Sequence, residues 1–172
     1  MIEELKSKIR DIPNFPKDGI IFKDITTLLQ DADAFRKAVD VMYDAVKDLE
    51  VSKVLSIEAR GFIFGGALAY LLGAGLVIAR KPGKLPYKTL KASYELEYGT
   101  DTLEVHEDAI EPDDKVLILD DLLATGGTAR AMVDLVKSVG AEVVGCCFLV
   151  ELDFLNGRKK LEGTPVISLI HY

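Results

Sequence analysis

The sequence predicts an α/β fold: a mostly parallel, doubly wound sheet with flanking helices. From residue 51 onward, apolar segments of strand length alternate with segments of helical spacing, a pattern typical of parallel strands joined by crossover helices. The chain has 172 residues, of which 49% are hydrophobic, so it is long enough to bury a substantial core. We therefore expect a single domain over residues 1–172.

The first segments of the chain are expected to be helical. The N-terminal stretch MIEELKSKIRD is charged and helix-like. Asp33 can cap a second helix, in which apolar residues from Phe35 to Leu49 keep helical spacing. Two further helices are expected at 61–73 and 128–139, because each ends at a glycine that can stop a helix.

The core strands are expected to be short apolar segments bounded by charged residues, glycine or proline. They lie at residues 51–59, 75–80, 115–121, 141–152 and 165–172. Residues 81–92 contain two prolines and a glycine without periodicity, which favours a loop. Residues 92–98 and 101–109 flank Gly-Thr and are expected to form a β-hairpin.

The charge distribution indicates a local anion site. A net charge of −7 argues against a nucleic-acid partner. The segment from Arg80 to Lys91 nevertheless holds five cations and no acid, whereas the segment from Ser93 to Asp114 holds nine acids and no Lys or Arg. One basic loop on an acidic protein favours a small anionic ligand over a polyanion.

The chain contains no apolar run of the roughly 18 residues that a membrane span needs, which argues against a membrane protein. Its N-terminus lacks the apolar core of a secretory leader. Cys146 and Cys147 are adjacent in an apolar strand, so they point to opposite faces and are poorly placed to pair. We therefore expect buried thiols in a reducing compartment and a cytoplasmic location.

The stretch VLILDDLLATGGTAR (116–130) carries the strongest chemical signal. Its glycine-rich strand-to-helix turn offers free backbone N–H groups and a helix N-terminus, which together bind phosphate. It matches neither a P-loop, because no lysine follows Gly127, nor the Gly-x-Gly-x-x-Gly dinucleotide motif. Asp120 and Asp121 stand side by side before the turn. Paired carboxylates there suit vicinal hydroxyls close to a phosphate, as in ribose 5-phosphate.

This stretch resembles the phosphoribosyl-pyrophosphate motif of the type I phosphoribosyltransferases, and its Asp-Asp-Leu-Leu-Ala-Thr-Gly-Gly-Thr form is similar to the adenine-specific members. The segments FPKDGIIFKDIT, EARGFIFG, RKPGKLP, YELEYGTDTLEVHEDAI and VELDFLNGR also resemble that family. The resemblance spans essentially the whole chain. It implies an enzyme of purine salvage, a glycosyltransferase that converts adenine and phosphoribosyl pyrophosphate to AMP and pyrophosphate with Mg²⁺.

The resemblance also implies roles for individual residues. Backbone and hydroxyl groups of the turn would hold the 5-phosphate, while Asp120 and Asp121 would accept hydrogen bonds from the ribose hydroxyls, directly or through metal-bound water. Mg²⁺ would be held mainly by substrate and water. The turn residues are Ala124, Thr125, Gly126, Gly127 and Thr128.

The leaving group would lie between two further segments. Backbone groups of Glu58 and Ala59 would hold pyrophosphate, and Arg60 would lie near pyrophosphate or base. Residues 81–109 would form a lid and hairpin, with basic residues of the loop able to reach a neighbouring subunit's site in a homodimer. These basic residues are Arg80, Lys81 and Lys84.

The base would be bound and activated by two other segments. Residues 1–30 would form a small hood-like base-pocket segment, with Ile21 against a ring face. Lys23 stands where some members carry arginine, and lysine lacks arginine's planar fork. Glu97 matches the acid/base residue for the purine nitrogens, with Glu95 as its local competitor and Tyr98 packed nearby. His106 and His171 are expected to be structural.

Two alternatives stay open at this stage. The base could be guanine, hypoxanthine or orotate, because the choice of adenine rests on resemblance. The chain could also be a non-enzymatic sensor of phosphoribosyl pyrophosphate, although such a regulator needs a nucleic-acid-binding element, and the first 50 residues and the net charge do not suit one.

Overall fold

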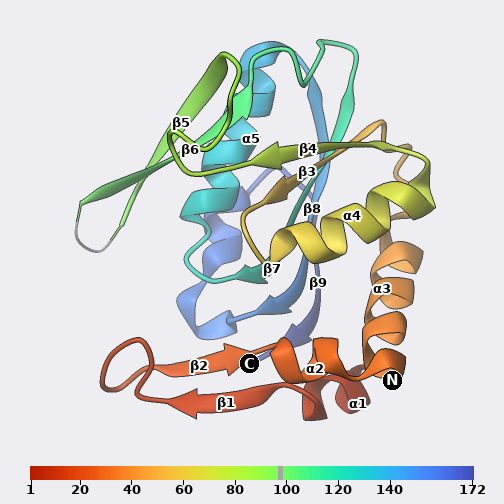
Figure 1. Ribbon diagram of the computed structural model, residues 1–172, viewed down its shortest axis with the longest axis vertical. Helices are drawn as coiled ribbons and strands as arrows, with labels where there is room; N and C mark the ends of the chain where they lie inside the picture. Colours follow the sequence, from red (N-terminus) through yellow and green to blue (C-terminus); the bar gives the residue numbers. More distant parts are fainter. Residues whose placement is uncertain (97–98) are drawn as a thin grey trace.

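A five-stranded parallel sheet forms the centre of the computed structural model, which describes residues 1–96 and 99–172 (Figure 1). The strand order is β4-β3-β7-β8-β9, and every neighbouring pair is parallel. The strands are β3 (Lys53–Ile57), β4 (Gly75–Ala79), β7 (Lys115–Leu123), β8 (Glu142–Glu151) and β9 (Val166–His171). All five expected strands are confirmed, each boundary within two residues of its prediction.

Helices cover both faces of the sheet. The helices α3 (Ala32–Val46) and α4 (Gly61–Leu72) pack on one face, and α5 (Gly127–Val139) packs on the other (Figure 1). Cys146 belongs to the core on the α5 side and Cys147 to the core on the α3–α4 side, so the prediction that they face opposite ways is confirmed. Both are free thiols, and burial raises the pKa of each to about 12.

The N-terminus of α3 differs from the expected one. Asp31, not Asp33, is the N-cap residue: its carboxylate accepts hydrogen bonds from the N–H groups of Asp33 and Ala34, both at 3.1 Å. Asp33 lies inside the first turn, where the positive end of the helix dipole stabilises its negative charge.

The first thirty residues form a separate small layer. They comprise α1 (Ile2–Ser7), β1 (Arg10–Pro13), β2 (Ile21–Asp24) and α2 (Thr26–Gln30), with β1 and β2 antiparallel. Figure 1 shows this hood beside the carboxyl ends of β8 and β9. Lys6 attaches it there, since its ammonium donates to the carbonyl of His171 at 2.5 Å.

The remaining elements surround the other end of the site. An antiparallel hairpin of β5 (Thr89–Glu95) and β6 (Thr100–His106) packs on α5. The hairpin is confirmed, but β5 takes the last four residues of the expected loop 81–92. Two short 3₁₀ helices, η1 (Asp153–Leu155) and η2 (Gly157–Leu161), connect β8 to β9. Among the described residues, no helix is long and apolar enough to cross a membrane.

Candidate active site

The strand order places two chemically distinctive turns side by side. After β3 the chain crosses to the edge strand β4, and it returns to β7 on the other side of β3. Ligands of doubly wound sheets bind at such a reversal, beyond the carboxyl ends of the two central strands. Here those ends carry Glu58–Gly61 after β3 and Asp120–Thr128 at the end of β7.

An ion pair joins the two turns. Arg60 Nε lies 2.9 Å from Asp121 Oδ2, and the Asp121 side chain is only 7% exposed. A buried carboxylate is costly without a partner, and Arg60 supplies it. The next residue, Gly61, lies very close to the end of β7. A Cβ at this position would lie 3.0 Å from Asp120 Oδ1.

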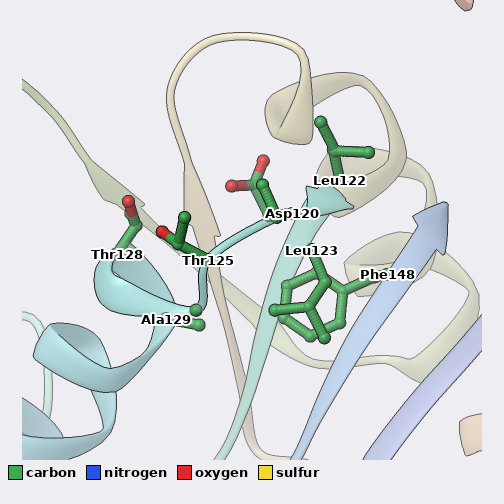
Figure 2. Close-up of a pocket in the computed structure, with 9 residues that line it drawn as sticks. Asp120, Leu122, Leu123, Thr125, Thr128, Ala129 and Phe148 are labelled. Atoms are coloured by element: carbon green, nitrogen blue, oxygen red, sulfur yellow. The ribbon is translucent and has the colours of Figure 1, made fainter. Parts of the chain in front are cut away.

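Asp120 lines a small cavity of about 70 Å³ beside the turn. Figure 2 shows its carboxylate and the hydroxyls of Thr125 and Thr128 on the same side of the turn. Its Oδ1 accepts the Asp121 N–H at 2.8 Å. Desolvation and the adjacent Asp121 carboxylate raise the pKa of Asp120 well above its usual range. The charged form of Asp120 is thus disfavoured in the ligand-free site, and a ligand that brings positive charge or hydroxyl donors would stabilise it.

The turn itself has the geometry of an anion site. Gly126 is the N-cap of α5 with φ +86°, and no side chain caps the helix. The first N–H groups of α5 are thus available, and they lie at the positive end of the helix dipole. The cavity at this turn is lined by residues that include Asp120, Ala124, Thr125, Gly126 and Thr128; Gly127 is the first residue of α5. The structure brings the predicted turn residues together with Asp120.

The basic loop meets the turn after β3. Glu58 accepts a hydrogen bond from the Lys81 N–H, and its Oε1 lies 3.8 Å from Arg80 Nε. The peptide between Glu58 and Ala59 is cis. The Lys81 ammonium pairs with Asp101 of β6, and the side chain of Lys84 is exposed on the same loop. Three predicted residues therefore share one cluster, whereas Lys84 stands apart in solvent.

A larger, mostly apolar cavity of about 380 Å³ lies between the hood and η1. Ile21 and Lys23, the two residues expected in the base pocket, both line this cavity, and Ile21 is 56% exposed. The Lys23 ammonium already has two partners: Asp11 Oδ1 at 2.7 Å and the Tyr172 ring, whose centroid is 3.9 Å away. Its charge thus holds the hood together.

Several lining residues of this cavity escaped the sequence analysis, because they lie between 131 and 151 positions from Ile21 in the chain. They come from the segment after β8 and from the C-terminal residue: Leu152, Phe154, Leu155 and Tyr172. The segment VELDFLNGR had been noted for its resemblance alone. Phe154 is 70% exposed, and an exposed aromatic side chain at a cavity is a signal of ligand contact.

Phe22 was also missed. It points to the other side of β2, where the Arg60 guanidinium lies 5.0 Å from its ring centroid. Arg60 therefore contacts both the hood and β7.

Glu97 and Tyr98 lie outside the described residues. Of the two histidines, His106 accepts the Tyr87 N–H at 3.3 Å and contacts its ring, as a structural residue does.

His171 has a richer environment than expected. Its Nδ1 lies 2.8 Å from Asp153 Oδ1 and 3.9 Å from Glu151 Oε2, and ligand atoms of the three residues all lie within 4.8 Å of one another. His171, expected to be structural, thus has two carboxylate neighbours of the metal-ligand type that the sequence does not place beside it. Arg158, however, already holds both oxygens of Glu151, at 2.8 and 2.9 Å.

Comparison with known proteins agrees with this geometry. The family described as "Phosphoribosyl transferase domain" matches residues 24–168. The adenine phosphoribosyltransferase of Geotalea uraniireducens is 61% identical over 171 residues, covering 99% of this chain and 100% of that protein. The corresponding protein of Pelobacter propionicus is 60% identical, with both chains covered completely.

Solved structures give the same result. A crystal structure of adenine phosphoribosyltransferase from Thermoanaerobacter pseudethanolicus matches with a TM-score of 0.97 and 53% identity, and covers both chains completely. The Saccharomyces cerevisiae enzyme, crystallised with an imino-altritol bisphosphate and adenine, matches with a TM-score of 0.91 and 40% identity over 98% of each chain.

Proposed function

The chain belongs to the adenine phosphoribosyltransferase family, and from that membership we propose how its site moves the 5-phosphoribosyl group from phosphoribosyl pyrophosphate to adenine. The reaction breaks the bond between C1 and the pyrophosphate oxygen and forms a bond between C1 and N9 of adenine. AMP and pyrophosphate are the products, so the enzyme is a glycosyltransferase. The observation that carries the site assignment is the junction of the two central turns, where Arg60 pairs with Asp121 at 2.9 Å.

The sugar phosphate binds at the turn after β7. The 5-phosphate accepts hydrogen bonds from the backbone N–H groups and hydroxyls of residues 124–128, at the open N-terminus of α5. Asp120 and Asp121 accept from the ribose hydroxyls. This fixes the sugar while C1 develops positive charge, so positioning supplies much of the rate enhancement.

The pyrophosphate leaves between the turn after β3 and the basic loop. Backbone groups of Glu58 and Ala59 bind it, with Arg60, Arg80, Lys81 and Lys84 providing positive charge. Lys81 exchanges its pairing with Asp101 for the pyrophosphate. Residues 81–109 act as the lid and hairpin, and residues 1–30 as the base segment, of one unit over residues 1–172.

Adenine binds along β2, in the cavity between the hood and η1. Ile21 packs against the ring, opposite apolar side chains of the 152–155 segment. The sheet of β1 and β2 has two strands among the described residues, so β2 keeps one edge whose backbone groups can read the edge of the base. The Saccharomyces cerevisiae relative was crystallised with adenine, which supports this choice of base.

Glu97 is proposed as the acid/base residue that accepts the N9 proton of adenine as the new bond forms. Tyr98 packs beside it. Replacing Glu97 by Ala should slow single-turnover chemistry; unchanged single-turnover rates would remove Glu97 from this role.

The residues at the turn fit the Mg²⁺ that the family uses. Mg²⁺ would be held mainly by substrate and water oxygens, and the carboxylates of Asp120 and Asp121 would offer it hard oxygen ligands at the sugar site. When bound, the ion neutralises charge on the departing pyrophosphate.

A homodimer is proposed from an exposed apolar face on α4 and the edge strand β4. Tyr70 is 86% exposed, and Ile63, Leu71 and Leu76 are each about 40% exposed or more. The basic loop follows β4 directly, so a partner on this face would lie beside it. Sedimentation equilibrium measures the assembly. Location in the cytoplasm stays a prediction from the sequence.

One assay tests the function most directly. With Mg²⁺ and phosphoribosyl pyrophosphate, the purified protein should convert adenine to AMP far faster than it converts hypoxanthine, guanine or orotate to their nucleotides. Equal rates would reject the base assignment. The absence of any turnover, with phosphoribosyl pyrophosphate still bound, would favour the sensor alternative.

A further inference from the structure

The phosphate turn is in direct backbone contact with a segment far away in the sequence. A Cβ built on Gly126 would lie 2.4 Å from the carbonyl oxygen of Gly157, and a Cβ built on Gly157 would lie 2.4 Å from the carbonyl oxygen of Ala124. Distances under 3.0 Å to backbone atoms leave no room for a side chain. The supporting segment, residues 151–161, therefore packs main chain against main chain where it meets the turn.

The two glycines are needed for different reasons. Gly126 has φ +86°, a conformation that other residues adopt only with strain. Gly157 is absent from the residues with positive φ and begins a 3₁₀ helix, so alanine could adopt its backbone conformation. The space is what excludes alanine, because the added methyl group would meet Ala124 O and, at 3.2 Å, Gly126 N. A third contact, to Leu123 Cδ1 at 3.0 Å, involves the end of a side chain. Gly157 therefore reports mainly on the fit against the main chain of the turn.

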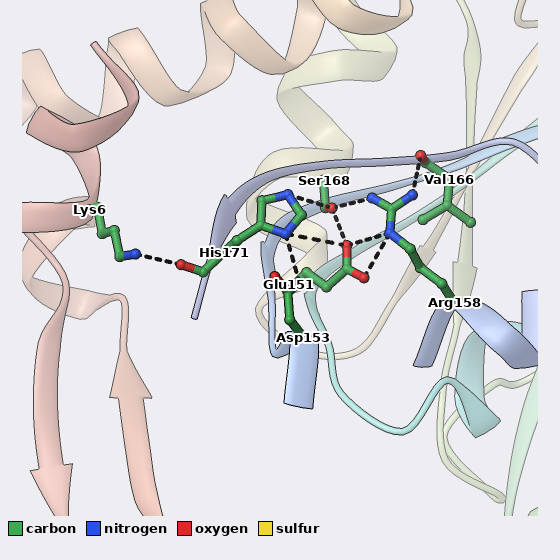
Figure 3. Close-up of polar contacts among 7 residues, drawn as sticks. All are labelled: Lys6, Glu151, Asp153, Arg158, Val166, Ser168 and His171. Atoms are coloured by element: carbon green, nitrogen blue, oxygen red, sulfur yellow. Dashed lines mark hydrogen bonds and ion pairs between the residues drawn. The ribbon is translucent and has the colours of Figure 1, made fainter. Parts of the chain in front are cut away.

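The residue after Gly157 fixes the segment in place. Arg158 donates through Nε to both oxygens of Glu151, through Nη1 to Val166 O at 3.1 Å, and through Nη2 to Ser168 Oγ at 2.7 Å (Figure 3). The Glu151 side chain is 4% exposed. A guanidinium that spans β8 and β9 leaves its own backbone little freedom, and that backbone carries Gly157.

Two more hydrogen bonds tie the segment to the elements on either side of the turn. The N–H of Leu152 donates to the carbonyl oxygen of Leu123, which is the last residue of β7, at 3.0 Å. Arg130, in the first turn of α5, donates through Nη1 to Lys160 O at 3.3 Å. The supporting segment therefore holds the residues before, within and after the turn.

We propose that Gly157 and Arg158 are positioning residues for the 5-phosphate, which act by holding residues 124–128 in their binding conformation. This inference rests on the assignment of that turn to the phosphate. It also gives the Glu151–Arg158 pair its purpose: Arg158 and Ser168 occupy the Glu151 carboxylate, so the cluster with Asp153 and His171 serves as an anchor and not as a cation site.

The test compares the binding of two ligands that use different ends of the site. Gly157→Ala should weaken the binding of ribose 5-phosphate by about tenfold to a hundredfold, since displacements near 1 Å at a binding group have effects of this size. Adenine binding should weaken much less, because the base cavity is lined by Leu152, Phe154 and Leu155 of the supporting segment but by neither Gly157 nor the turn. Gly66→Ala is the matched control, because a Cβ there meets nothing within 4 Å.

Arg158 gives a second test that inserts no atom into the turn. Arg158→Met should weaken ribose 5-phosphate binding, and Arg158→Lys should fall between Met and the unchanged protein, because lysine keeps the charge but not the fork. These variants remain informative if Gly157→Ala does not fold. The thermal unfolding of each variant is measured alongside. Among variants of equal stability, ribose 5-phosphate affinity must still fall more than adenine affinity.

Two outcomes would overturn the inference. Ribose 5-phosphate affinity could stay unchanged in both Gly157→Ala and Arg158→Met. The variants could lose affinity for both ligands equally, as general destabilisation would cause. Thr128→Ala, which removes a hydroxyl of the turn itself, separates the causes: if it too leaves ribose 5-phosphate binding unchanged, the phosphate assignment fails; if it alone weakens binding, only the positioning role fails.

Discussion

The two ends of the active site are built in contrasting ways. At the phosphate end, the turn joins β7 to α5 and lies against the backbone of the supporting segment. At the base end, the hood consists of four-residue strands and short helices, attached by buried side chains such as Leu5 and Leu28 and by the charged side chain of Lys6. The phosphate group is small and constant in shape, whereas the base is a flat ring that enters and leaves a cleft. A fixed cradle suits the first, and a separate layer of short elements suits the second.

The ion pairs within the hood are individually weak. Arg10 pairs with Asp24 at 2.6 Å and Lys23 with Asp11 at 2.7 Å, and in each pair one side chain is 55% exposed. Exposed ion pairs contribute about 0–1 kcal/mol each. At the turn, in contrast, a single methyl group added to Gly126 or Gly157 would have to displace main-chain atoms. The comparison predicts that substitutions at the phosphate end have the larger effects.

The largest effect is expected from replacing both Asp120 and Asp121 by Asn. Hydrogen bonds to charged groups contribute about 1.5–3 kcal/mol each, so the KM for phosphoribosyl pyrophosphate should rise at least about 100-fold. Adenine affinity should change much less. Steady-state kinetics with each substrate varied in turn measures both; Asp113→Asn, on an exposed loop, is the control. A small change in KM would mean that the ribose lies elsewhere.

A smaller effect, on stability, is expected from a matched pair of glycines. Gly126→Ala and Gly19→Ala share the cost of a positive φ, +86° and +85°, which is about 1–2 kcal/mol. At Gly19 a Cβ meets nothing within 4 Å, whereas at Gly126 it meets Gly157 O at 2.4 Å. Gly126→Ala should therefore lower the free energy of unfolding by about 1–3 kcal/mol more. Urea titration measures both, and equal losses would contradict the contact.

The smallest effect concerns pH and the hood. The Thr26 hydroxyl, followed by Arg10, lowers the pKa of Asp24 to about 2. Because the folded-state pKa lies below the unfolded value near 3.8, Asp24 stabilises the fold above that value and loses this contribution as pH falls through about 2. Asp24→Asn should flatten the pH dependence of the unfolding free energy between about pH 4 and pH 2. Asp18→Asn serves as the exposed control, and identical curves for both variants would refute the assignment.

The same contrast explains what the sequence alone could predict. The parallel sheet, its strands and the phosphate turn follow local patterns: apolar runs, helical spacing, and a glycine-rich turn after paired aspartates. The hairpin of β1 and β2 does not, because four-residue strands such as RDIP and IFKD are too short to show a period. Its existence depends on contacts with the sheet ends.

Long-range contacts account for the other misses. Nothing near Asp121 in the sequence indicates that Arg60 is its partner, although the cost of a buried carboxylate predicts that some cation lies there. The base cavity brings Ile21 together with Tyr172, and the Gly126–Gly157 contact joins residues 31 positions apart through a fit of main-chain atoms. Such fits have no signature in composition or periodicity.

Arg60 is the one side chain described above that touches both ends of the site, with Asp121 on one side and the Phe22 ring on the other. A sugar phosphate whose ribose hydroxyls donate hydrogen bonds to Asp121 competes with Arg60 for that carboxylate, and thereby changes the contacts that Arg60 makes with the strand that meets the base. The two substrates are then thermodynamically linked: each changes the affinity of the other by the same factor. Titrating adenine with and without ribose 5-phosphate gives that factor, and a value of one would mean that the hood and the sheet bind their ligands independently.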